Sequence, residues 1–389
     1  MKEIIIFDKV LKTLDVINEV DLKNKINKII KKIIKYSEKN GYGGNLVENY
    51  FSHIILYKKN IFSELCAAKE IEKVNIMKKS IIKEIDEIKI LISKLGSEIK
   101  NRGYEYIFDY GKSKNNINIF ENKNIDEIVE FLMKFYSENG SGEVSKGRFF
   151  KWNEKKNKIV NIVNVDKITF NDLVGYSYQK DEIIQNTAAF VEGKSANNVL
   201  LTGSRGTGKS SMVKASINKY YKKGLVCVEI QKEQCEKLDI IMKKLAKIKK
   251  RIILFIDDLS FEDSEMGYKK LKSVLEGGVE QKAENILIYA TSNRRHLIKE
   301  TFSERSSNDE VSRNDSINEK LSLADRFGLN IYFSSPTQQE YLDIVYELAE
   351  KKGLNISKEK LKELAIKWEI SQNGRSGRSA VQFLQSCHI

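Results

Sequence analysis

The sequence is poor in the residues that build disulfide frameworks and metal sites. It has four cysteines and three histidines among 389 residues. No two cysteines form a C-x-x-C pair, and none stands at a metal-binding spacing from a histidine. The sequence therefore gives no indication of a redox motif or a zinc site. We expect reduced thiols in the core of a cytoplasmic protein, at Cys66, Cys227, Cys235 and Cys387.

Long apolar runs are also absent. No stretch reaches the roughly 20 residues that cross a membrane, so we expect a soluble protein with no membrane partner. The first residues carry the acids Glu3 and Asp8, where a secretory signal would carry positive charge. Both observations favour a cytoplasmic location.

Acidic residues are outnumbered by basic ones. The formal net charge is +13, with 67 Lys and Arg against 54 Asp and Glu. Such a charge is typical of proteins that bind nucleic acids or membrane surfaces. However, the lysines are scattered along nearly the whole chain, as on solvated helix faces. Nucleic acid is therefore an alternative partner that no motif supports.

One stretch indicates a phosphate-binding site. The apolar run 199–201 is followed by a turn that fits G-x-x-x-x-G-K-[ST] at every fixed position, and then by an expected helix over 210–221. Glycines let successive backbone N–H groups face a polyphosphate at the start of that helix. Lys209 can reach the β- and γ-phosphates, and the Ser210 hydroxyl can bind Mg²⁺. The sequence predicts a nucleoside triphosphate bound by Gly203, Ser204, Arg205, Gly206, Thr207, Gly208, Lys209, Ser210 and Ser211.

A second apolar strand ends in two acids. Residues 251–256 are followed by Asp257 and Asp258, beyond the phosphate loop in the chain. This position indicates that Asp257 orients Mg²⁺ and its bound water, rather than capping a helix. Further strands expected at 225–230 and 286–290 alternate with helices, which predicts a parallel sheet with helices on both faces. Ligands bind at the carboxyl ends of such strands, where these motifs fall.

Together these residues resemble AAA+ ATPases. Phe170-Asn-Asp-Leu-Val-Gly175, the phosphate loop, the acidic strand end, Asn293 and Arg326-Phe-Gly328 follow one another in the order found in that superfamily. The motif sequences are still more similar to the predicted-ATPase family 815 among domains of unknown function. That resemblance covers the chain from about Val165 to the C-terminus and includes Asp257-Asp-Leu-Ser-Phe-Glu262, Val274-Leu-Glu-Gly-Gly278 and Glu319-Lys-Leu-Ser-Leu-Ala-Asp-Arg-Phe-Gly328. It implies ATP and Mg²⁺ as cofactors.

The resemblance also assigns roles to single residues. Asn293 matches sensor 1, which positions the attacking water. Arg326 matches the arginine finger that a neighbouring subunit inserts, which implies a homo-oligomer. Arg378 matches sensor 2 on the helical lid, with Arg375 as an alternative. The expected catalytic residues are Asp258, Asn293, Arg326 and Arg378.

Arginine is scarce in a chain that otherwise uses lysine for positive charge. It has 11 arginines, and six fall in segments expected to surround the phosphates, where a planar fork suits phosphate oxygens. These six are Arg205, Arg294, Arg295, Arg326, Arg375 and Arg378.

One departure from AAA+ proteins concerns the catalytic acid. They usually place Glu after the Mg²⁺-orienting Asp, whereas this chain has Asp258. An Asp carboxylate can accept a proton from water but is one methylene shorter, so we expect slow hydrolysis. Glu262 is a weaker candidate for the base. In the polar segment 304–316, Arg305 and Arg313 are rival fingers.

The patterns divide the chain into four regions. Residues 1–150 are expected to be mainly helical, and their apolar spacing over 65–95 predicts a long amphipathic helix in a bundle or a coiled-coil arm. Residues 151–164 are the expected linker, 165–335 the AAA+ core and 336–389 the helical lid. The lid is expected to begin with Ser335 as N-cap, Pro336 as first helical residue and Gln338 as capping-box partner.

We therefore expect a Mg²⁺-dependent ATPase that, as an oligomer, remodels a macromolecule held by the N-terminal domain. One alternative is a nucleic-acid-linked loader or remodeller, and another is an ATP-dependent binding switch with little turnover. The segment between Ile230 and Leu238 lacks an aromatic-apolar-glycine pore loop, which disfavours an unfoldase. A small-molecule kinase is disfavoured because it would give the lid and Arg326 no role.

Overall fold

The structure is a computed structural model that describes residues 22–111, 116–260, 266–276, 283–293, 323–371 and 374–387. The chain divides into two compact units, Met1–Gly147 and Arg148–Ile389. Each unit is described by itself below. In the described ranges, no helix is long and apolar enough to cross a membrane.

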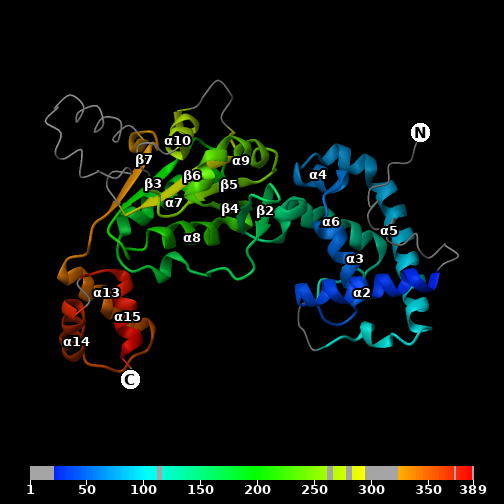
Figure 1. Cartoon of the computed structure of the whole chain (residues 1–389), viewed down its shortest axis with the longest axis horizontal. Helices are drawn as coiled ribbons and strands as arrows, with labels where there is room; N and C mark the ends of the chain where they lie inside the picture. Colours follow the sequence, from blue (N-terminus) through cyan, green and yellow to red (C-terminus); the bar gives the residue numbers. More distant parts are fainter. Residues whose placement is uncertain are drawn as a thin grey trace. The chain divides into compact units, whose positions relative to one another are not determined.

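The N-terminal unit is a helical bundle (Figure 1). Asparagine side chains cap three of its helices by accepting backbone N–H groups of the first turn. The longest helix, α5, buries apolar residues at three- and four-residue steps against the core and contacts α3, α4 and α6. The long amphipathic helix therefore belongs to a bundle and not to a coiled-coil arm. The elements are α2 (Leu22–Asn40), α3 (Leu46–Tyr57), α4 (Ile61–Ala67), α5 (Ile71–Lys100), η2 (Glu105–Phe108), α6 (Ile125–Asn139) and η3 (Gly142–Lys146).

The second unit is built on a seven-stranded sheet of order β2-β1-β4-β5-β6-β3-β7. Neighbouring strands are parallel except for the antiparallel pair of β1 and β2. The central strands are buried almost throughout, as their continuous apolar runs require. The strands are β1 (Phe149–Asn153), β2 (Lys158–Asn161), β3 (Val199–Gly203), β4 (Leu225–Ile230), β5 (Arg251–Ile256), β6 (Ile286–Ser292) and β7 (Leu329–Phe333).

Helices cover both faces of this sheet. Apolar residues of α7 and α8 pack on one face, and Figure 1 shows α9 and α10 on the other side. Strand β3 carries the phosphate loop, and β6 lies between it and the acidic strand β5. The motifs predicted at the carboxyl ends of three strands therefore lie along one edge. The elements are η4 (Phe170–Asp172), α7 (Ser177–Val191), α8 (Lys209–Tyr220), η5 (Tyr221–Lys223), η6 (Lys232–Lys237), α9 (Leu238–Leu245) and α10 (Met266–Glu276).

Three further helices form the lid, namely α13 (Gln338–Lys351), α14 (Lys358–Ser371) and α15 (Gly377–Ser386). They share an apolar core of their own. The predicted start of the lid was wrong by two residues. Thr337 is the N-cap and forms the capping box with Glu340, because it is the Thr337 hydroxyl that accepts the N–H group of Glu340.

We predicted that residues 151–164 form a linker, but two strands lie there, because β1 occupies 149–153 and β2 occupies 158–161. The prediction was wrong because the many lysines in this segment are typical of a solvated linker, although the apolar residues between them form strands. The apolar side chains between the lysines are buried, and β1 pairs in parallel with β4, which lies far along the chain. The buried residues are Phe149, Phe150, Trp152 and Ile159. The boundary between the two units lies before this hairpin, at Gly147.

The fold class predicted from the sequence is confirmed. A mainly helical N-terminal part precedes a core built on a mostly parallel sheet that carries the phosphate loop, and three helices follow this core.

Candidate functional site

The phosphate loop joins the end of β3 to the start of α8. Gly203, Gly206 and Gly208 have φ of 127°, 76° and 91°, which L side chains rarely adopt. At Gly203 a Cβ would also lie 2.0 Å from the carbonyl oxygen of Phe333 on β7. Gly208 is the N-cap of α8 and has no side chain to accept the first N–H groups of the helix. The positive end of α8 is therefore open to an anion.

A cavity of about 710 Å³ lies over this loop. One end is polar and includes the phosphate loop, Asp257, Asp258 and Asn293. The other end is lined by apolar side chains from the segment before α7 and from the lid, among them Leu173, Val174, Ile344, Leu348 and Val381. A lining that combines polar groups with apolar side chains is typical of sites that bind small molecules.

Lys209 is buried at the polar end, with 6% of its surface exposed. Its Nζ donates to the carbonyl oxygens of Gly203 at 2.9 Å and Ser204 at 2.7 Å, and to Asn293 Oδ1 at 3.0 Å. Burial lowers the pKa of Lys209 to about 8, although the Asp258 and Asp257 carboxylates oppose this shift. An anion bound here would stabilise the charged form of the lysine.

The two acids make different contacts at the end of β5. Asp257 Oδ1 accepts the Ser210 hydroxyl at 2.6 Å and the Thr291 hydroxyl at 2.5 Å. Asp258 Oδ1 accepts Nδ2 of Asn293 at 2.7 Å, and its backbone has φ of 53°. Asn293 therefore contacts both Lys209 and Asp258.

The contacts of Ser210 and Asp257 fit a Mg²⁺ site. Both residues offer hard oxygen atoms, which are the ligands that Mg²⁺ takes. Over the described ranges, no three His, Cys, Asp or Glu side chains group closely enough to hold a metal. A Mg²⁺ ion at a phosphate loop needs no such group, because phosphate oxygens and waters supply most of its ligands.

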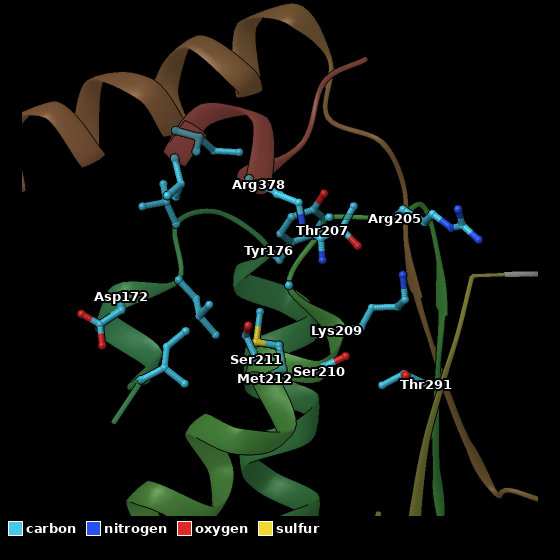
Figure 2. A pocket seen from close by; sticks show the side chains of 18 of the residues that line it. Asp172, Tyr176, Arg205, Thr207, Lys209, Ser210, Ser211, Met212, Thr291 and Arg378 are labelled. Carbon is cyan, nitrogen blue, oxygen red and sulfur yellow. The ribbon is translucent and has the colours of Figure 1, made fainter. Parts of the chain in front are cut away.

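The structure places the predicted arginines in different surroundings. Arg378 lines the cavity, and its backbone N–H donates to the Gly206 carbonyl oxygen at 3.1 Å. Arg375 instead pairs with Glu369 within the lid and is not a lining residue. Arg326 pairs through Nε with Glu276 at 2.5 Å and does not line the cavity. Figure 2 shows Arg205 extending away from Lys209, Ser210 and Thr291, while Arg378 lies on the lid side of the loop.

A protein family matches most of this unit. It is described as a protein of unknown function (DUF815), and the match spans residues 145–388, which is more than half of the chain. The chain belongs to the DUF815 family. The predicted resemblance to family 815 is therefore confirmed.

Similar solved structures include RuvB of Thermotoga maritima. One RuvB variant aligns with the DUF815 chain at 17% identity, over 56% of this chain and 62% of that chain, with a TM-score of 0.38. Another, described as a Holliday junction branch migration motor, aligns at 13% identity over 57% and 72%, with a TM-score of 0.35. The first of these alignments spans less than two thirds of RuvB, and at this similarity RuvB provides no argument about what the DUF815 chain does. A comparison with curated proteins gives no match.

Sequence reasoning missed Thr291, which contacts the two acids at the end of β5, Asp257 and Asp258. Its hydroxyl donates to Asp257 and accepts the Asp258 N–H group at 2.9 Å. A polar residue at the end of the apolar run 286–290 was the available signal. The other candidate residues Glu262, Arg294, Arg295, Arg305 and Arg313 lie outside the described residues.

A proton-linkage prediction follows from the lowered pKa of Lys209. At pH 8 about half of these lysines should be uncharged in the free protein, and a bound triphosphate should restore the charge. Binding of a non-hydrolysable ATP analogue should then take up about half a proton at pH 8 and less at pH 6.5. Calorimetric titrations in two buffers of different ionisation enthalpy measure this uptake.

The control variant is Lys209→Arg, because a guanidinium stays charged over this pH range. Subtracting its proton uptake removes the contribution of the nucleotide itself. Equal proton uptake by wild type and variant at pH 8 would contradict the recharging of Lys209 by a bound triphosphate.

Proposed function

We propose that this DUF815 protein is a Mg²⁺-dependent ATPase that works as an oligomer and remodels a macromolecular partner. The observation that carries the proposal is the contact chain across the ends of three strands. Asn293, which follows β6, contacts Lys209, which follows β3, and Asp258, which follows β5. In this arrangement a cation for the phosphates lies beside a carboxylate that can accept a proton from water.

This geometry supports the following roles for the chain's own residues. The backbone N–H groups of 204–211 and Lys209 would bind the phosphates, and the apolar end of the cavity would hold the base. Ser210 and Asp257 would hold Mg²⁺, which supplies charge stabilisation at the phosphates. Asn293 would orient the attacking water, and Asp258 would accept its proton. Arg378 is a lining residue and would contact the phosphates from the lid.

The position of Arg326 supports an oligomer. It does not line the cavity of its own chain, and in the proposed oligomer it would contact the γ-phosphate of a neighbouring subunit. Its ion pair with Glu276 is partly exposed to solvent, with side-chain exposures of 27% and 44%. Such a pair is weak and can exchange for a phosphate.

The N-terminal unit is the proposed partner-binding part. Isoleucines on α5 are exposed although the same helix also supplies much of the core, and they offer apolar contact area to another molecule. They are Ile71, Ile76 and Ile90.

A binding switch with little turnover is the second candidate function. It is favoured by Asp258, which stands where AAA+ proteins usually carry Glu. In that case ATP binding alone, without fast hydrolysis, would change the affinity for the partner.

The first prediction concerns the base. Asp258→Asn keeps size and polarity but cannot accept a proton, so turnover should fall at least about 100-fold while ATP affinity stays within about threefold. Steady-state phosphate release and a nucleotide titration measure the two quantities. Asp181→Asn, an exposed acid on α7, should change neither. Hydrolysis by Asp258→Asn at the parent rate would remove Asp258 from the mechanism.

The second prediction concerns assembly. Lys209→Ala and Arg326→Ala should each hydrolyse ATP poorly, since removal of a finger alone can cost about 10³-fold. A one-to-one mixture should regain activity, because Lys209→Ala subunits donate Arg326 to intact phosphate loops next to them. The measurement is steady-state ATPase activity of each variant and of the mixture, with co-assembly followed by light scattering. A mixture that co-assembles but regains no activity would remove Arg326 as a finger.

A further inference from the structure

We propose that Thr291 is a positioning residue that fixes both acids, and that the left-handed backbone it stabilises at position 258 is the reason for Asp there. The inference rests on the proposed ATPase function and names a residue that the sequence patterns did not indicate. It concerns how two side chains are held and not what they react with.

The contacts of Thr291 join two strands at the edge of the sheet. Ala290 on β6 lies opposite Ile256 on β5, so the next residues, Thr291 and Asp257, are neighbours across the strands. The Thr291 hydroxyl donates its one proton to Asp257 Oδ1 at 2.5 Å and accepts the Asp258 N–H group at 2.9 Å. Its carbonyl oxygen accepts the Leu259 N–H group at 2.7 Å. One residue thus bonds to three consecutive residues of the turn.

Burial gives these bonds their directing effect. Thr291 is 2% exposed, and its branched Cβ limits the rotation of its side chain. The hydroxyl therefore has a fixed direction, and it accepts the Asp258 N–H group from that direction. The result is a turn in which Asp258 has φ of 53°.

The left-handed backbone separates Asp from Glu at this position. Asn and Asp adopt positive φ more readily than other residues that have a Cβ. From this backbone the Asp258 carboxylate accepts a hydrogen bond from Nδ2 of Asn293 at 2.7 Å. A Glu would place its carboxylate one methylene further along and would disfavour the left-handed turn. The departure from the usual AAA+ pattern is therefore matched by the local backbone.

The experiment uses the full-length protein and three threonine variants. Thr291→Val removes the hydroxyl and keeps the shape, while Thr291→Ser keeps the hydroxyl. Thr187→Val is the matched control, since Thr187 is also buried and bonded through its hydroxyl but lies on α7 away from the cavity. The affinity for a fluorescent ATP analogue is measured in EDTA and in Mg²⁺, together with kcat and KM for ATP.

Loss of the hydroxyl should act on the metal and on turnover. In Thr291→Val the affinity in EDTA should stay within about threefold of wild type, while the gain in affinity from Mg²⁺ should shrink about 10-fold, as when a partner of a metal ligand is lost. Its kcat should fall at least about 30-fold with KM within about threefold, because the phosphate loop is intact. Thr291→Ser should restore all four quantities to within about threefold, and Thr187→Val should leave them unchanged.

Asp258→Glu tests the backbone part of the proposal. We expect its turnover to fall at least about 10-fold, although Glu is the usual residue in AAA+ proteins. Turnover equal to or above that of wild type would overturn the backbone argument. A wild-type Mg²⁺ gain and kcat in Thr291→Val, or a loss in Thr291→Ser as large as in Thr291→Val, would overturn the role of the hydroxyl.

Failure of the proposed function gives a different result. Wild-type protein that gains affinity from Mg²⁺ but does not hydrolyse ATP would overturn the proposed ATPase, and the Mg²⁺ gain of Thr291→Val would still decide the role of Thr291. Wild-type protein with no Mg²⁺ gain would overturn both.

Discussion

The Lys209 ammonium group, buried at the end of β3 among neutral oxygen atoms, is the feature on which the rest of the site depends. Two backbone carbonyl groups and the Asn293 amide hold it. The lowering of its pKa from 10.5 to about 8 corresponds to about 3 kcal/mol at neutral pH. Because folding lowers this pKa, the buried lysine does not reduce the stability of the fold above its unfolded pKa of 10.5. As the pH falls from 10.5 to about 8, stability is lost, and below pH 8 the full cost applies. The fold tolerates this cost at neutral pH, and a bound polyanion would offset it.

The positions of the other groups follow from that of Lys209. Close approach of β3 and β7 requires glycine at 203, and the sharp loop places Lys209 at the first position of α8. Asn293 reaches Lys209 because β6 lies next to β3, and it reaches Asp258 because β5 lies on the other side of β6. The lid contacts the same loop, because Arg378 donates its backbone N–H group to Gly206. Ser335, which lies between β7 and the lid, donates its hydroxyl to Ser204 of the loop. In the proposed ATPase, these contacts would link nucleotide binding to the position of the lid.

Sequence reasoning succeeded where short spacing determines geometry. The phosphate loop needs its glycines and lysine at fixed intervals, and the strand ends of a parallel sheet meet at one edge, so both could be predicted without any contact information. The linker prediction at 151–164 was wrong because β1 becomes a strand by pairing with β4, and no local pattern encodes that partner. Thr291 was missed for the same reason, since its importance depends on which residues of β5 lie beside it. The lid start was misplaced because Ser335 and Thr337 can both cap a helix, and the backbone decides between them.

Titration calorimetry with a non-hydrolysable ATP analogue, on wild type and Lys209→Ala, tests the central claim most directly. Wild type should bind, and Lys209→Ala should lose affinity at least about 30-fold, because a charge-assisted bond to phosphate is lost. Lys214→Ala is the control, because Lys214 lies on the same helix, is partly exposed and pairs with Asp166 at 3.7 Å. This variant should bind as wild type does. Affinity of Lys209→Ala equal to that of wild type would contradict the assignment of this loop to the phosphates.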